Sequence, residues 1–144
     1  MPPIITVIFI LFLSTVSTNA QSGSWRVLPN SPVAIDRWDA MHFVHQDSGW
    51  IAGTKSGVFR TRNAGETWQE LPSAYYSPTD KPYFRSMGWA NSRVGWLGAL
   101  GGKHQIFHTS DGGDSWTRHS FPKESGVGGI CGIKVIDELT AYFV

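Results

Sequence analysis

The chain has 144 residues and a formal net charge of +1, with 12 Lys and Arg against 11 Asp and Glu. Its basic residues are scattered singly, and binding to nucleic acid or to an anionic membrane needs clustered Lys and Arg, so neither partner is expected. Seven Trp and sixteen Gly are the unusual part of the composition, and no window holds apolar residues at a helical period. We therefore predict an all-β chain of many short strands.

The first twenty residues differ in character from the rest of the chain. Ile4 to Leu13 is an apolar run with a single Thr, and Thr18-Asn19-Ala20 offers the small residues that signal peptidase prefers. We interpret residues 1–20 as a secretory signal peptide, with an uncleaved anchor or a buried strand as the alternative. The run is shorter than the about 20 residues of a membrane-spanning helix. We therefore expect an exported protein, periplasmic or secreted, without stable membrane insertion.

A repeat with a period of 46 residues accounts for most of the remaining sequence. The segment that begins Gly49-Trp50 returns as Gly95-Trp96, and a third copy places Tyr142 where the first has Trp50. Periods of roughly 40 to 50 residues with four short strands are typical of propeller blades. We predict an all-β β-propeller of four-stranded blades, of which about two and a half are present in an incomplete ring.

Strands can be assigned within each repeat. Blade one is expected at about residues 38–71 and blade two at about 84–120, while a third blade starts at about 130 and runs to 144. In blade one the expected strands are residues 38–44, 49–53, 57–62 and 67–71; in blade two they are 84–90, 94–99, 105–110 and 115–120. Residues 24–28 resemble the last strand of each blade, which predicts a ring-closing strand. Because closed propellers typically have about 4 to 8 blades, residues 21–144 are expected to be the N-terminal fragment of a longer propeller.

One short motif occurs twice, between the third and fourth expected strands of each blade. Both copies follow the pattern Ser/Thr-x-Asp-x-Gly-x-Ser/Thr-Trp, with an Asn replacing the Asp in the first copy. The short carboxylate or amide accepts backbone N–H groups across a tight hairpin, and the glycine adopts a positive φ. We assign a structural role to the motif residues Thr61, Asn63, Gly65, Trp68, Thr109, Asp111, Gly113 and Trp116.

These motifs are Asp-boxes, or BNR repeats, and their flanks resemble the photosystem II stability/assembly factor-like repeat. The resemblance rests on the Gly-Trp phrase ahead of each box and on the Phe43 to Asp47 pattern, and it covers nearly all of residues 21–144. It implies an exported, non-catalytic propeller that acts as a protein-binding or assembly platform. The expected location is the thylakoid lumen if the organism is photosynthetic, and no cofactor is implied.

Candidate binding residues lie where the innermost strands begin, at the axial end of the propeller. The 46-residue shift makes Asp39 equivalent to Arg85, and Arg37 equivalent to Tyr83. We predict that these four residues form a polar rim, on which the forked guanidinium donors would bind carboxylates of a protein partner. The alternative is an Asp-Arg pair that only ties neighbouring blades together. Cys131 falls at the same repeat position, and we expect it to be a buried thiol.

A glycoside hydrolase is the alternative function, because sialidases and some endoglucanases also carry Asp-boxes. Such enzymes need an arginine triad with a Tyr and acidic partners, or two carboxylates facing a cleft. Arg37 and Arg85 are available, but Arg85 is followed by Ser86-Met87 where a sialidase would have Ile-Pro. We therefore assign no catalytic residue. No metal site is predicted either, because the histidine pairs at 42 and 45 and at 104 and 108 do not converge on strands.

Overall fold

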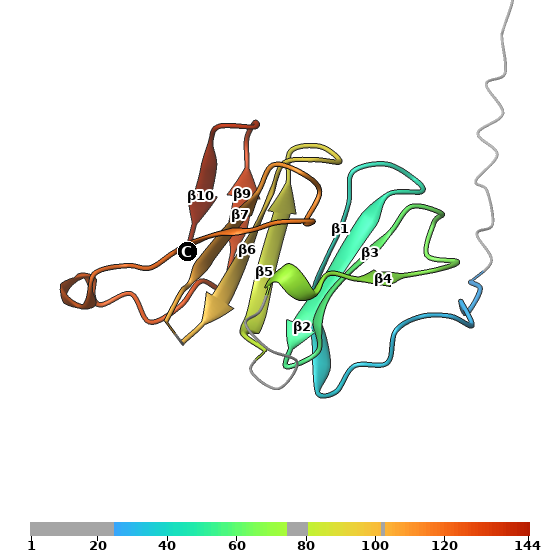
Figure 1. The fold of residues 1–144 in the computed structure, drawn as a ribbon, viewed down its shortest axis with the longest axis horizontal. Coiled ribbons are helices and arrows are strands. Elements are labelled where there is room, and N and C mark those ends of the chain that lie inside the picture. The colour runs from blue at the N-terminus through green and yellow to red at the C-terminus, as the bar shows by residue number, and fades with distance from the viewer. Residues whose placement is uncertain (1–24, 75–80, 102) are drawn as a thin grey trace, which may run out of the picture.

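A computed structural model describes residues 25–74, 81–101 and 103–144 of the chain (Figure 1). Within this part, strands dominate and the only helical segments are two 3₁₀ turns, η1 (Pro72–Ala74) and η2 (Lys123–Ser125). No helix in the described part of the chain has the length and apolar character needed to cross a membrane. The expected signal peptide, residues 1–20, lies outside the described residues.

Two four-stranded antiparallel units follow one another along the chain. The first unit contains β1 (Arg37–Phe43), β2 (Gly49–Thr54), β3 (Gly57–Thr61) and β4 (Gln69–Glu70), paired in chain order. The second unit repeats this arrangement with β5 (Tyr83–Trp89), β6 (Gly95–Leu100), β7 (Ile106–Thr109) and β8 (Thr117–His119). We refer to these units as blade one and blade two.

The blades stand side by side with their first strands innermost. β5 lies beside β1, and a single bridge between Thr54 and Tyr83 joins the two units. A third unit begins with β9 (Ile133–Val135), which packs beside β5 and pairs with β10 (Ala141–Phe143). This is the arrangement of successive blades in an incomplete β-propeller, as the repeat predicts.

The outermost strands are shorter than the expected 67–71 and 115–120. Two hydrogen bonds explain the difference: the backbone N–H of Thr67 donates to Asn63 Oδ1, and that of Ser115 donates to Asp111 Oδ1 (both 2.9 Å). The first residues expected in each outer strand are therefore hydrogen-bonded within the Asp-box turn. Ladder pairing starts only at Gln69 and Thr117.

The core lies between the blades and combines three tryptophans with Phe, Leu, Val, Met and Ala side chains. Trp50 on β2 stacks on Trp89 of β5 with ring centroids 3.7 Å apart, and Trp89 meets the edge of Trp116 at 6.0 Å. Glycines make room for these rings. A Cβ added to Gly95 would lie 2.3 Å from the Trp89 ring, and Gly49 has the same relation to the Phe43 ring at 2.6 Å. The Gly-Trp phrase of the repeat is therefore a packing device that recurs in each blade.

The segment before β1 lies along blade one without forming a strand. Leu28 Cδ1 lies 2.7 Å from where a Cβ on Gly65 would be, and Leu71 Cδ1 has the same distance to that position on Gly113. Leu28 thus takes, in front of the first Asp-box, the place that Leu71 takes in front of the second. Since residues 25–28 have no ladder partner in the described structure, the ring-closing role of residues 24–28 stays a prediction.

The buried thiol expected at Cys131 is wrong, because the Cys131 side chain is exposed. Two features explain the difference. β9 begins only at Ile133, so Cys131 lies before the strand. The neighbouring Ile130, which is 3% exposed, takes the inward position, and its side chain approaches Gly98 of β6.

Candidate functional site

Matching β-bulges shape the axial end of the two blades. The pairing of β1 with β2 shifts register between Trp38 and Ala40, and the pairing of β5 with β6 shifts between Phe84 and Ser86. Asp39 and Arg85 are the additional residues at these two positions. A bulge leaves the extra residue outside the ladder and re-aims its side chain. The repeat aligns the two residues, and the bulges direct them toward the seam between the blades.

The carboxylate of Asp39 is the centre of the resulting cluster. Its Oδ1 accepts hydrogen bonds from Arg37 Nε at 2.7 Å and from Arg85 Nη1 at 3.0 Å. Its Oδ2 accepts from the Thr54 hydroxyl at 2.7 Å and from the Thr54 backbone N–H at 3.1 Å. The Asp39 side chain is 9% exposed, whereas those of Arg37 and Arg85 are 54% and 33% exposed. One buried carboxylate therefore anchors two accessible guanidinium groups.

These contacts keep Asp39 ionised. Burial by itself would raise the pKa of Asp39, but hydrogen bonds from Thr54 and Arg37 outweigh that effect and hold the pKa below its usual value. A carboxylate in this state accepts hydrogen bonds and does not donate a proton near neutral pH. Its contribution to the site is to position the two arginines.

Tyr83 lies near this cluster, but it is not among the residues that donate hydrogen bonds to the Asp39 carboxylate. It begins β5, it is 43% exposed, and it pairs across the blade boundary with Thr54. Lys55, in the turn between β2 and β3, places its Nζ 5.4 Å from the centre of the Tyr83 ring. The structure thus joins Arg37, Asp39 and Arg85 directly and sets Tyr83 beside them.

Sequence reasoning missed Thr54 and Lys55. Both belong to the hairpin between the second and third strands, and in an antiparallel unit this turn returns to the end at which the first strand begins. The strand assignment from the sequence already implied that this turn lies near Arg37 and Asp39. We call Arg37, Asp39, Arg85, Tyr83, Thr54 and Lys55 the axial rim.

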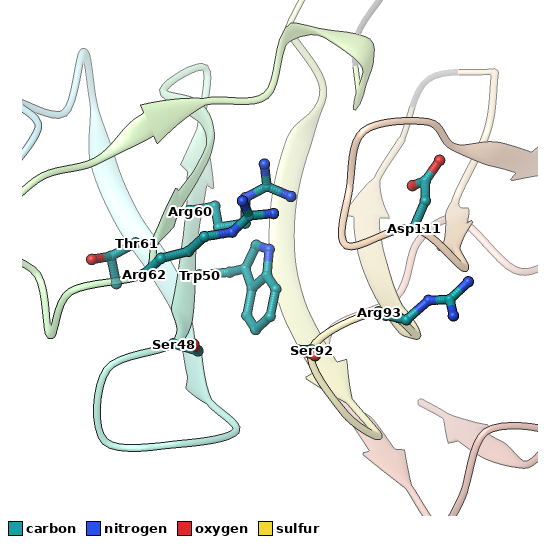
Figure 2. A pocket seen from close by; sticks show the side chains of 8 residues that line it. All are labelled: Ser48, Trp50, Arg60, Thr61, Arg62, Ser92, Arg93 and Asp111. Carbon is teal, nitrogen blue, oxygen red and sulfur yellow. The ribbon is translucent and has the colours of Figure 1, made fainter.

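The opposite end of the strands holds a cleft between the blades. It has a volume of about 320 Å³, and Figure 2 shows side chains from both blades around it. Blade one contributes Ser48, Trp50, Arg60, Thr61 and Arg62, and blade two contributes Ser92, Arg93 and Asp111. Of these residues, only the Asp-box members Thr61 and Asp111 were predicted as site residues. Arg60 and Arg62 were missed because the 46-residue shift aligns them with Ile106 and His108, which are not basic residues of the same kind.

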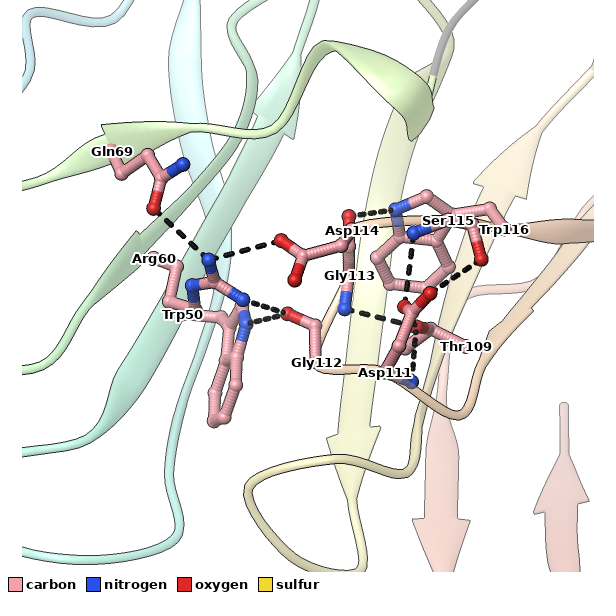
Figure 3. Close-up of polar contacts among 10 residues, drawn as sticks. All are labelled: Trp50, Arg60, Gln69, Thr109, Asp111, Gly112, Gly113, Asp114, Ser115 and Trp116. Carbon is pink, nitrogen blue, oxygen red and sulfur yellow. Dashed lines mark hydrogen bonds and ion pairs between the residues drawn. The ribbon is translucent and has the colours of Figure 1, made fainter.

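The Asp-box of blade two is held by hydrogen bonds around Asp111 (Figure 3). Thr109 donates its hydroxyl to Asp111 Oδ1 at 2.7 Å and accepts the Gly113 backbone N–H at 2.9 Å. Ser115 donates its hydroxyl to Asp111 Oδ2 at 2.6 Å. Asn63 occupies the same place in blade one, where its Oδ1 accepts the backbone N–H of residue 67 at 2.9 Å. These hydrogen bonds close the hairpin.

The same Asp-box also binds blade one to blade two. Arg60, which is 5% exposed, donates from Nη1 to Gly112 O at 3.0 Å and forms an ion pair with Asp114 at 3.0 Å. Its Nη2 also donates to Gln69 Oε1 at 3.0 Å, and the indole N–H of Trp50 donates to the same Gly112 O at 3.1 Å. Figure 3 shows these donors converging on the turn. One backbone carbonyl thus joins the two blades through two buried side chains.

Asp111→Asn is expected to remove part of the acid sensitivity of the fold. Burial alone would raise the pKa of Asp111, but hydrogen bonds from Ser115 and Thr109 lower it from 3.8 to about 2. A lowered folded-state pKa stabilises the fold above the unfolded pKa, and this contribution is lost as the pH falls from about 4 to about 2. Because Asp111 is exposed, we expect about 1 kcal/mol. Urea unfolding at about pH 6 and about pH 2.5 measures the difference, which should be smaller in the variant.

Asn63→Asp is the matched control for this prediction. The amide at Asn63 already makes the equivalent hydrogen bonds without titrating, including one from Nδ2 to Thr67 Oγ1 at 2.9 Å. Introducing a carboxylate there should add acid sensitivity in the same pH range. If the two variants respond to acid as the unmodified chain does, the Asp111 carboxylate is not the titrating group.

The chain is similar in sequence to a family of known proteins. The sequence profile of the family described as photosynthesis system II assembly factor YCF48 matches residues 17–140. The photosystem II stability/assembly factor HCF136, chloroplastic, of Oryza sativa subsp. japonica is 30% identical over 135 residues, which cover 76% of this chain and 31% of that protein. The family match thus includes both blades and both Asp-boxes.

Two solved structures show the same fold. A structure described as YCF48 bound to D1 peptide matches with a TM-score of 0.63 and 23% identity, covering 81% of this chain and 36% of that one. YCF48 from Cyanidioschyzon merolae matches with a TM-score of 0.59 and 21% identity, covering 82% and 33%. The chain therefore spans about a third of the length of these relatives. With its paired blades, its two Asp-boxes and a family match over most of its length, the chain belongs to the photosynthesis system II assembly factor YCF48 family.

Proposed function

We propose that this chain is part of an exported, non-catalytic propeller that binds another protein and acts as an assembly platform. The observation that carries the proposal is the pair of accessible guanidinium groups at Arg37 and Arg85, both fixed on the buried carboxylate of Asp39. Family membership supports it, since a relative is named a stability/assembly factor and a similar structure is described as bound to a D1 peptide.

The axial rim suits an acidic segment of a protein partner. An arginine that is already held in place loses less conformational entropy when it binds, so its interaction contributes more to affinity. The planar guanidinium matches a carboxylate with two parallel hydrogen bonds. Tyr83 and Lys55 add an exposed aromatic ring and a further cation beside the two arginines. An acidic side chain next to an apolar one is the partner chemistry that fits this surface.

The hydrolase alternative gains no support from the axial rim. A glycosidase needs a carboxylic acid with a raised pKa and a second carboxylate at a separation of about 5 to 10 Å. Asp39 is the carboxylate of this cluster, its pKa is lowered, and both its oxygens are already bonded to Thr54 and to the two arginines. These contacts favour a positioning role over proton transfer.

Export to a compartment outside the cytoplasm is part of the same proposal. It rests on the apolar run and the small residues within residues 1–20. The rice relative is described as chloroplastic. In a photosynthetic organism we propose the thylakoid lumen as the location, and in another bacterium the periplasm or the exterior.

Arg85→Ala is expected to weaken binding of a D1 peptide by about tenfold, because one charge-assisted hydrogen-bond donor of the rim is removed. Fluorescence anisotropy with a labelled D1 peptide measures the affinity, and circular dichroism shows whether the variant is folded. Asp39 keeps its contacts with Arg37 and Thr54 in this variant, so the rim is not dismantled.

Lys123→Ala is the matched control, since Lys123 is an exposed cation in η2 outside the axial rim. It should bind the peptide as the unmodified chain does. Equal affinity of Arg85→Ala and the unmodified chain would remove Arg85 from the binding surface. The same result for Arg37→Ala would refute the site altogether.

A further inference from the structure

A second site with unused hydrogen-bond donors lies at the Asp-box end of the blades. It is separated from the axial rim by the length of β1, because Arg37 pairs with Thr54 at one end of the ladder and Phe43 pairs with Gly49 at the other. Gly49 in turn pairs with Thr61, the first residue of the Asp-box. The cleft between the blades therefore opens at the end of the molecule that the proposed partner site does not use.

Arg60 and Arg62 line two hollows at this end. One is the inter-blade cleft of about 320 Å³, and the other, of about 220 Å³, is bordered by Thr67, Trp68 and Gln69 of the first Asp-box and β4. Figure 2 shows the Arg60 and Arg62 side chains extending in the same direction past the indole of Trp50, toward blade two. Both hollows can therefore be reached by a ligand that contacts these two arginines.

Several donors in these hollows have no acceptor within the described residues. The Nε of the buried Arg60 is unpaired, although both of its Nη atoms are bonded. Trp68 has a buried, unpaired indole N–H, whereas the equivalent Trp116 donates to Gly113 O at 3.0 Å. A buried donor without an acceptor costs free energy, and a ligand can accept from these two atoms only if the side chains move to expose them.

The charges at the cleft also favour an anion. Arg62 and Arg93 are both exposed, and neither forms an ion pair with a described residue. The acidic residues nearby are already engaged: Asp114 pairs with Arg60, and both oxygens of Asp111 accept hydrogen bonds from within its own turn. The exposed Arg62 and Arg93 face the carboxylate of Asp111, and Glu138 lines the adjoining hollow that Arg93 and Ser92 also border. A singly charged carboxylate fits this balance better than a doubly charged phosphate, which Asp111 would repel more strongly.

We propose that the cleft between the two blades binds a carboxylate, with the Arg62 guanidinium as its forked donor and the Ser92 hydroxyl as a further donor. The carboxylate is supplied either by a small carboxylic acid or by an acidic side chain of a peptide. Arg93, on the wall contributed by blade two, adds to the positive potential of the cleft. The site does not depend on the proposed function of the axial rim, because the two share no residue.

The test uses the full 144-residue chain and a capped peptide, acetyl-Gly-Glu-Gly-amide. Two-dimensional ¹H–¹⁵N spectra follow the Nε–H signals of the arginines during titration. We expect the Arg60 and Arg62 signals to shift as the peptide binds, and we expect Arg62→Gln to weaken binding at least tenfold, because it removes a charge-assisted fork. Arg62 has no partner among the described residues that the change would disrupt, and Arg93→Gln provides a second variant on the other wall.

Two controls separate this site from general attraction of anions. Acetyl-Gly-Gln-Gly-amide has the same shape without the charge and should not bind, and Lys123→Gln, outside both sites, should bind the glutamate peptide normally. Acetate that binds as tightly as the peptide identifies a small acid as the ligand, and tighter binding of the peptide identifies an acidic side chain. Equal shifts with both peptides, unchanged affinity of Arg62→Gln, or tighter binding of inorganic phosphate than of the peptide would each overturn the proposal.

Discussion

Replacing Trp50 with alanine is expected to destabilise the chain by about 4 kcal/mol, the largest effect of any single side-chain truncation. Trp50 is 1% exposed and stacks on Trp89 with ring centroids 3.7 Å apart. Its indole N–H also donates to Gly112 O, the carbonyl shared with Arg60. Truncation would leave a large cavity between the blades and remove one of the two side chains that hold the second Asp-box. Urea unfolding followed by tryptophan fluorescence measures the loss.

Two further variants separate the causes of this loss. Trp50→Phe keeps a ring against Trp89 but removes the hydrogen bond, and we expect a cost of about 1 to 2 kcal/mol. Trp96→Ala changes the equivalent residue of blade two, which is 8% exposed and contacts His108 instead of a second indole. We expect it to cost roughly half as much as Trp50→Ala. If Trp96→Ala costs as much, packing between blades one and two is not the main contribution of Trp50.

Gly53→Ala is expected to destabilise the chain by about 3 kcal/mol. A Cβ at this position would lie 2.0 Å from the carbonyl oxygen of Arg37 and 3.0 Å from the Cα of Trp38. These are backbone atoms at the bulge in β1, so the clash can be relieved only by moving the strand. That movement would displace Asp39, the residue on which the axial rim is built. Under the function proposed above, Gly53→Ala should also weaken binding of a protein partner to the axial rim.

Gly128→Ala is the matched control for the Gly53 variant. No heavy atom lies within 4 Å of a Cβ built at Gly128, and its φ is not in the left-handed region. The change should alter the free energy of unfolding by less than about 0.5 kcal/mol and leave peptide binding intact. A Gly53→Ala chain as stable as the Gly128→Ala chain would show that β1 adapts without cost at the bulge.

The repeat predicted the architecture well, and the reason is local. Asn63 and Asp111 make their hydrogen bonds within their own hairpins, and the aromatic residues at 43 and 89 cover glycines in the neighbouring strand of the same blade. Each device is complete within one 46-residue unit. The main strand errors lay in the outer strands, where the Asp-box holds residues that their β-propensity assigned to the ladder.

The axial rim was predicted in part. The repeat period brought Asp39 and Arg85 to equivalent positions, and the structure joins them at 3.0 Å. This contact is compatible both with the predicted binding surface and with the alternative of a blade-to-blade tie. The hydrogen bonds from Thr54 to Asp39 could not be predicted from the repeat, because they depend on how the bulge in β1 orients the Asp39 side chain.

Sequence by itself determined the all-β repeat and the Asp-box hairpins, because those features follow from periodicity and from hydrogen bonds over a few residues. Only the tertiary structure decided how the blades are joined. Arg60 reaches across 52 positions to Gly112, and Arg85 reaches across 46 to Asp39. Such contacts depend on the angle between two packed blades and on bulges that shift side chains out of alternation, and neither quantity is encoded in the local spacing of residue types.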